Sequence, residues 1–173
     1  TRIPSSAASD VYKRQGYFPE GWYTATTDGA LRRDVELTLA MGFNCARKHQ
    51  KAEDPRYLYW ADKLGLMVWA EMPSGRVFST ELIESLTTEW MELIKRDRAN
   101  PSIIAWVPFN ESWGVWHQSE RPEQRAFVDA VTSLTKALDD SRVVVGNDGW
   151  EYSSGDLWTC LLYTSDAADD GIR

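Results

Sequence analysis

The chain has 173 residues, a formal net charge of −7 and 43% hydrophobic residues. An acidic chain without a block of Lys and Arg argues against nucleic acid or an anionic membrane surface as the partner. No apolar run approaches the roughly 18 residues that a membrane span needs. Nine tryptophans are an aromatic excess that suits either a large core or a cleft in which rings stack on a ligand.

The two ends do not read as natural protein sequence. Residues 5–15 read SSAASDVYKRQ, which resembles a translated transposase sequencing adaptor, and residues 160–170 read CLLYTSDAADD. A DNA sequence that encodes the first segment also encodes most of the second when its opposite strand is read with a shift of one base. We therefore assign residues 1–15 and 160–173 to adaptor-derived tails, and residues 16–159 to one domain.

The length of this domain excludes a complete eight-stranded β/α barrel, which needs about 250 residues. Residues 16–159 suffice for five or six β/α units. Cys160 belongs to a tail under this assignment, so Cys45 is alone and no disulfide is expected within the domain.

The first half of the domain alternates helical patterns with short apolar runs. Residues 16–23 are expected to hold the loop after a first strand. A helix is predicted over residues 28–41, a strand over 43–47, a helix over 54–65 and a strand over 66–70. Asp-Pro at the start of the second helix and Gly at its end are typical helix boundaries.

The second half continues the alternation. A helix capped by Ser79-Thr80 is predicted to end before Asn100-Pro101. A strand over 103–107, a helix over 122–138 and a strand over 143–145 follow, and residues 156–159 are expected to begin another strand. Such a series without a linker predicts one α/β domain, a partial TIM (β/α)8 barrel of roughly strands 1 to 6.

Every predicted strand ends in polar residues, and the carboxyl ends of parallel strands meet at one rim, where functional residues gather. The polar residues after the strands are Arg47, Lys48, His49, Glu71, Asn110, Glu111, Asn147 and Asp148.

Glu111 is the most informative of them because it follows an apolar strand, where an ionised carboxylate is costly to bury without partners. A glutamic acid that stays protonated near neutral pH can donate a proton to a leaving glycosidic oxygen and later act as a base. The alternative is a structural carboxylate paired with Arg47 or Lys48. Trp113 and Trp116 follow and offer faces for a pyranose ring.

Three segments resemble the catalytic barrel of glycoside hydrolase family 2, which includes β-galactosidases, β-glucuronidases and β-mannosidases. They are MGFNCARKHQKAEDPRYLYWADKLGLMVWAEMPS, RDRANPSIIAWVPFNE and VVVGNDGWE. The Asn-Glu after an RDxNPSI-type strand is the most specific part of the resemblance, which covers essentially all of residues 16–159.

The resemblance implies roles for particular residues. Glu111 matches the family's acid/base at the end of strand four, and Asn110 matches its asparagine that binds the sugar 2-hydroxyl. Arg47 matches an arginine of strand two that supports the nucleophile. His49 lies near the family's substrate histidine, but Lys48-His49-Gln50 departs from the β-galactosidase form, which leaves the substrate open.

Further residues are candidates for lining the sugar site. Trp69 and Trp106 are equally well explained as core residues of the barrel. The candidates for substrate binding, besides Asn110, Arg47 and His49, are Glu71, Trp69, Trp113, Asn147, Asp148 and Trp150.

A retaining glycosidase needs a second carboxylate as nucleophile. In the resembled family it comes from strand seven, which this sequence does not reach. Glu71 and Asp148 lie on other strands, so neither is assigned. We therefore expect hydrolysis of O-glycosidic bonds by the parent protein and no activity from this chain alone.

Three other functions fit parts of the sequence. The first is an endo-acting barrel of the same clan that cleaves cellulose or mannan. The second is a barrel that binds carbohydrate without turnover. The third is a metal-dependent barrel that uses His49, His117, Glu71 and Asp148, which the absence of a closely spaced ligand pair disfavours. Carbohydrate is the expected partner, and no metal or cofactor is expected.

Overall fold

The computed structural model of the protein describes residues 11–14 and 27–159. Its elements run in the order β1 (Val11–Arg14), α1 (Asp28–Ala40), β2 (Cys45–Lys48), α2 (Pro55–Leu64), β3 (Met67–Glu71), α3 (Thr80–Asp97), β4 (Ile103–Val107), α4 (Pro122–Leu138) and β5 (Val143–Val144). All neighbouring strands pair in parallel, and their order in the sheet is β1-β2-β3-β4-β5.

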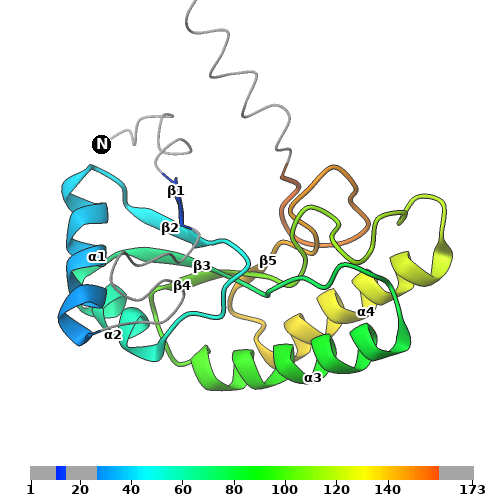
Figure 1. The fold of residues 1–173 in the computed structure, drawn as a ribbon, viewed down its shortest axis with the longest axis horizontal. Coiled ribbons are helices and arrows are strands. Elements are labelled where there is room, and N and C mark those ends of the chain that lie inside the picture. Colours follow the sequence, from blue (N-terminus) through cyan, green and yellow to red (C-terminus); the bar gives the residue numbers. More distant parts are fainter. Residues whose placement is uncertain (1–10, 15–26, 160–173) are drawn as a thin grey trace, which may run out of the picture.

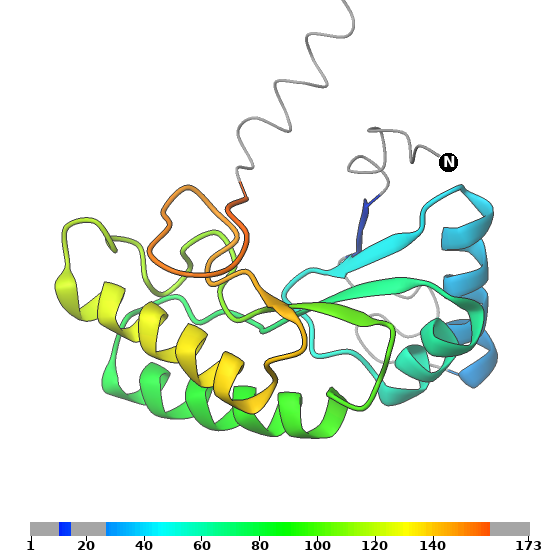
Figure 2. The same cartoon turned by 180° about the vertical axis from the view of Figure 1, so that it is seen from behind.

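This topology makes the chain part of a barrel. Because each strand lies beside the next one in sequence and β-α-β connections are right-handed, successive helices are placed on the same face of the sheet. Figure 1 shows α1 and α2 together near one end of the curved sheet, and α3 beside α4 near the other. Figure 2 shows the same arrangement from behind. The predicted partial TIM barrel is therefore confirmed, with five strands in the described residues.

Local sequence signals set the helix ends. Asp54 caps α2 by accepting a hydrogen bond from the amide of Arg56 at 2.8 Å, and Gly65 ends the helix in the left-handed conformation at φ 82°. Ser79 caps α3 by accepting from the amide of Leu82 at 3.2 Å. These signals act within a few residues, so the sequence alone predicts them correctly.

Strand boundaries agree less closely because a strand extends only where its neighbour offers backbone partners. β2 and β3 each begin and end one or two residues later than expected. The strand expected over residues 156–159 is wrong. Asp156 folds back onto the free edge of β5, where its amide donates to the Val144 carbonyl at 2.7 Å and its carboxylate accepts from the Val144 amide at 2.8 Å.

β1 lies in the segment that we assign to an adaptor. It pairs with β2 from Val11 opposite Cys45 to Arg14 opposite Lys48. A parallel ladder is made by backbone groups, so an extended segment of any origin can complete the edge of β2. The adaptor assignment of residues 1–15 and 160–173 therefore stays a prediction, and the loop expected over residues 16–23 lies outside the described residues.

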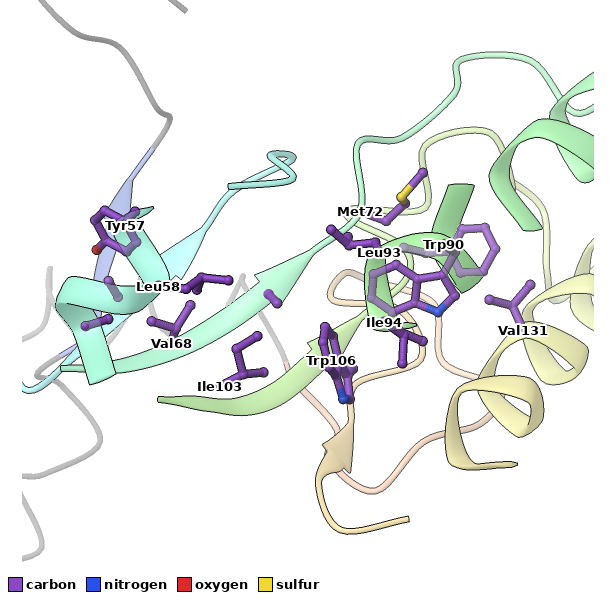
Figure 3. Close-up of a cluster of buried hydrophobic side chains, with 14 of the residues drawn as sticks. Tyr57, Leu58, Val68, Met72, Trp90, Leu93, Ile94, Ile103, Trp106 and Val131 are labelled. Carbon is purple, nitrogen blue, oxygen red and sulfur yellow. The ribbon is translucent and has the colours of Figure 1, made fainter. Parts of the chain in front are cut away.

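The core fills the space between the sheet and the helices. Figure 3 shows its centre, where Trp90 of α3 meets Trp106 of β4. Their rings are perpendicular, with centroids 5.7 Å apart. The indole N–H of Trp90 donates to Thr135 Oγ1 at 2.8 Å and that of Trp106 to Asp139 Oδ2 at 2.9 Å. Trp106 is therefore a core residue and does not face a ligand.

Lys48 points to this helix-covered face as well. Its ammonium is fully buried, lies 2.5 Å from Glu53 Oε2 and packs 3.6 Å from the ring centroid of Tyr57. Burial lowers the pKa of Lys48, although Glu53 partly opposes the shift.

Among the described residues, no helix is long and apolar enough to cross a membrane.

Candidate active site

The face of the sheet opposite the helices carries the polar side chains singled out in the sequence. Arg47 of β2 is in register with Trp69 of β3, and side chains in register on parallel strands point to the same face. Glu71 lies two residues beyond Trp69 and points the same way. Trp69 is half-buried and lies on the same face of the sheet as Arg47.

Arg47 is the centre of a buried polar cluster. Its Nε donates to Glu71 Oε2 at 2.6 Å, and its two terminal nitrogens contact Asn110 Oδ1 and Asp148 Oδ2. All four side chains are buried. A planar guanidinium with five donors can serve three acceptors in fixed directions, which a lysine cannot do. Arg47 therefore ties the ends of β2 and β3 to the loops after β4 and β5.

The loop after β2 is bound to the same carboxylate. The amide of Gln50 donates to Glu71 Oε1 at 2.8 Å, and His49 Nδ1 lies 3.4 Å from that oxygen. Gln50 has a positive φ of 49°, which turns the chain back toward Glu71. Nothing in the sequence pattern pointed to Gln50, because its contact uses the backbone amide.

Asn110 has an orientation fixed by its partner. Because Arg47 can only donate, the atom that faces it is the amide oxygen of Asn110, and the amide nitrogen points elsewhere. That Nδ2 is buried and has no hydrogen-bond partner among the described residues. A buried donor without a partner is costly, so it is a candidate for binding a polar ligand group.

Glu111 follows on a sharp turn. Glu111 and Ser112 both have left-handed backbone conformations, with φ of 50° and 57°. Such conformations cost on the order of 1–3 kcal/mol each in residues other than glycine and persist only where the surroundings hold them. The half-buried position of Glu111 at a strained strand end is typical of a functional residue.

The loop after β5 holds this turn. Asp148 accepts from the Glu111 amide through its carbonyl at 2.8 Å, and the side chain of Asn147 accepts from the Ser112 amide at 3.0 Å. Asn147 Nδ2 also donates to Ser112 Oγ at 2.9 Å. A Cβ on Gly149 would lie 2.9 Å from the Glu111 Cα, so only glycine allows this approach.

The two cations of the alternative in which Glu111 is a structural carboxylate have other acidic partners. Arg47 binds Glu71, Asn110 and Asp148, and Lys48 binds Glu53 on the opposite face. The structure thus gathers the predicted residues Arg47, His49, Glu71, Asn110, Glu111, Asn147 and Asp148 at one rim.

Tryptophans line the outer part of this rim. Trp113 and Trp116 of the loop after β4 have ring centroids 4.5 Å apart, and Trp116 stacks on Trp150 of the loop after β5 at 6.1 Å.

The metal-dependent alternative gains no support, because no three His, Cys, Asp or Glu side chains in residues 11–14 and 27–159 are grouped to hold an ion.

Comparison with known sequences decides the family. The domain described as "Glycosyl hydrolases family 2, TIM barrel domain" matches residues 24–165, most of the chain. The chain belongs to glycoside hydrolase family 2.

Individual family 2 relatives agree with this assignment. A β-galactosidase of Thermoanaerobacter pseudethanolicus is 28% identical over 125 residues, which is 70% of this chain and 16% of the relative. A β-galactosidase of Lactococcus lactis is 28% identical over 149 residues, which is 80% of this chain and 14% of the relative.

A solved β-glucuronidase structure shows the same fold. The apo structure of Bacteroides uniformis β-glucuronidase 3 superposes with a TM-score of 0.69 and 26% identity, over 78% of this chain and 18% of that protein. The chain spans only a small part of these relatives, 14% and 16% of the length of the two β-galactosidases.

Proposed function

We propose that the complete protein containing this chain is a retaining β-glycosidase that hydrolyses O-glycosidic bonds of a carbohydrate substrate, with Glu111 as the acid/base. One observation supports this most strongly. The strained turn at Glu111 and Ser112 is held by Asn147 and Asp148 directly beside the buried Arg47–Asn110 pair. A turn that costs energy and is fixed from a second loop serves to aim the carboxyl group.

The residues suit the two steps of such a reaction. Glu111 first donates its proton to the leaving-group oxygen while a carboxylate on the other side attacks the anomeric carbon. It then removes a proton from the water that releases the sugar from that carboxylate. The unpartnered Nδ2 of Asn110 is a donor for the sugar hydroxyl next to the anomeric carbon, and Arg47 holds it in that orientation.

We propose that Glu71 and Asp148 position other residues and do not react with the sugar. Both carboxylates are buried against Arg47, which leaves them poorly placed to attack a sugar. They position Arg47 and through it Asn110, while the resemblance to family 2 assigns the nucleophile to a later strand. His49, Trp69, Trp113 and Trp150 are proposed to line the sugar site.

Aryl β-glycosides test the proposal. The 173-residue chain should give no turnover, and the complete protein should release the phenol. In the complete protein, Glu111→Gln should lower kcat/KM, which reports the step that releases the leaving group, by about 10²–10⁴-fold on substrates with poor leaving groups. The loss should be much smaller for dinitrophenyl glycosides, because dinitrophenolate leaves without protonation.

Glu120→Gln is the matched control, since Glu120 is an exposed glutamate of the same loop and should leave kcat unchanged. Turnover by the 173-residue chain that Glu111→Gln abolishes would show that the nucleophile lies within it and refute our assignment. Equal losses of kcat/KM for good and poor leaving groups would remove Glu111 from the acid role. Sugar binding without any turnover by the complete protein would favour the non-catalytic alternative, and cleavage of cellulose or mannan the endo-acting one.

A further inference from the structure

Three tryptophans form a partly exposed aromatic surface at the rim. Trp113 and Trp116 meet edge to face at 4.5 Å, and Trp116 stacks on Trp150 with an interplanar angle of 29° at 6.1 Å. Trp150 is 52% exposed. We call Trp113, Trp116 and Trp150 the tryptophan cluster. A large exposed ring loses hydrophobic stabilisation, so such a cluster indicates a surface that binds a ligand.

The tryptophan cluster is held in place from a third loop. The indole N–H of Trp116 donates to the carbonyl of Arg76 at 3.1 Å, in the loop between β3 and α3. Gly75 and Gly114 bring the two loops together, since a Cβ on Gly114 would lie 3.0 Å from the Gly75 carbonyl oxygen. The cluster is thus a fixed surface built by the loops after β3, β4 and β5.

Its place relative to Glu111 determines which part of a substrate it meets. Trp113 lies two residues after Glu111, and Trp150 follows Gly149, which abuts the Glu111 Cα. Arg47 and Asn110 are buried at the strand ends, whereas Trp150 is exposed. A general acid faces the oxygen between the cleaved sugar and its leaving group. We therefore infer that the side chains nearer to the solvent than Glu111 face the leaving group.

Arg76 adds a positive charge to this surface. Its guanidinium lies 6.0 Å from the ring centroid of Trp113, and its side chain is exposed. Among residues 11–14 and 27–159, no carboxylate forms an ion pair with it. Glu151, which follows Trp150 in the chain, accepts hydrogen bonds from the Gln118 amide and from Ser119 Oγ. An arginine in this position offers two parallel donors to two oxygens of a carboxylate or sulfate.

We propose that the tryptophan cluster and Arg76 form a leaving-group subsite for a pyranose ring that carries a carboxylate or sulfate. The sugar stacks on the partly exposed indoles of the tryptophan cluster, and the oxyanion binds Arg76 beside Trp113. The name leaving-group subsite rests on the proposed function of Glu111. The binding of an acidic sugar at this surface does not require catalysis.

Binding is measured on the 173-residue chain by titration calorimetry and tryptophan fluorescence. The probes are three disaccharides that differ at one end: one with glucose, one with glucuronic acid and one with glucose 6-sulfate. Both acidic probes should bind about fivefold more tightly than the neutral one, the size expected for one exposed ion pair. Preference for only one of them identifies the oxyanion.

Variants locate the contact. Arg76→Met should remove the preference for acidic probes, and Arg125→Met, an exposed arginine of α4, should keep it. Trp150→Ala should weaken all probes about two- to tenfold, whereas Trp158→Ala, an exposed tryptophan outside the cluster, should not. Far-UV circular dichroism checks that each variant folds.

Equal affinity for acidic and neutral probes, or no binding to the folded chain, would overturn the proposal. The outcome is separate from that of the catalytic assay. If Glu111→Gln leaves turnover intact while Arg76→Met abolishes the preference, the assignment of Glu111 fails and the acidic-sugar subsite stands. If Glu111→Gln abolishes turnover and no preference exists, the reverse holds.

Discussion

Replacement of Arg47 by methionine tests the buried cluster most directly. The variant keeps the apolar stem of the side chain but removes the cation that Glu71 and Asp148 share. Both carboxylates are almost completely buried, so they would lose their counter-charge without gaining water. Removing one partner of a buried ion pair costs about 3–5 kcal/mol. Because a typical domain has only about 5–15 kcal/mol of stability, the loss is large.

Urea unfolding of the 173-residue chain, followed by tryptophan fluorescence and circular dichroism, measures this loss. The slope of the free energy against urea should stay constant if the fold is kept. Arg125→Met is the matched control. Arg125 makes an exposed ion pair with Asp129 on α4 at 4.0 Å, and its loss should cost at most about 0.5 kcal/mol.

A triple variant separates lost charge balance from lost packing. If the cost of Arg47→Met comes from uncompensated carboxylates, adding Glu71→Gln and Asp148→Asn should recover part of it, because the uncharged side chains are cheaper to bury. A cost of Arg47→Met below about 1 kcal/mol would refute the reasoning. So would a triple variant that is no more stable than the single one.

Three further outcomes follow from other parts of the structure. Burial raises the pKa of Asp139, but hydrogen bonds from Ser141, Trp106 and Arg142 outweigh it and lower this pKa below its usual 3.8. As the pH decreases, the unfolded chain therefore takes up a proton at Asp139 before the folded chain does, and the folded chain loses stability. Asp139→Asn should make this loss of stability smaller in acid unfolding curves. Burial raises the pKa of the Cys45 thiol to about 11, so in a Cys160→Ser variant iodoacetamide should label it slowly at pH 7 unless urea is added, and rapid native labelling would contradict this. Gly149→Ala places a Cβ 2.9 Å from the Glu111 Cα and should lower kcat of the complete protein at least about tenfold, with unchanged kcat as the contrary result.

Much of the fold follows from local sequence signals. The caps at Asp54 and Ser79, the glycine end at Gly65 and the spacing of apolar residues predict the four helices of the described residues nearly residue by residue. The strand Ile103–Val107 is predicted with its observed bounds, because apolar residues fill it and Asn100-Pro101 precedes it. Signals of this kind act between neighbours in the chain and need no tertiary contact.

Errors arise where the partner is distant in sequence. The strand expected over residues 156–159 is replaced by Asp156 binding the edge of β5, a competition that periodicity does not reveal. Trp69 and Trp106 both read as apolar strand residues, and only the register of β3 and β4 places Trp69 opposite the helices and Trp106 in the core.

Glu111 illustrates the division between sequence and structure. The Asn-Glu pair at the end of an apolar strand of a family 2 barrel is recognisable from the sequence, because that pattern is contiguous. The contact of Arg47 with Asn110 from 63 residues away, and the support of the turn after Glu111 by Asn147, become visible only in the folded chain. Parallel strands bring their carboxyl ends together whatever lies between them, so the contacts at the rim depend on register and on loop conformation, which no local pattern encodes.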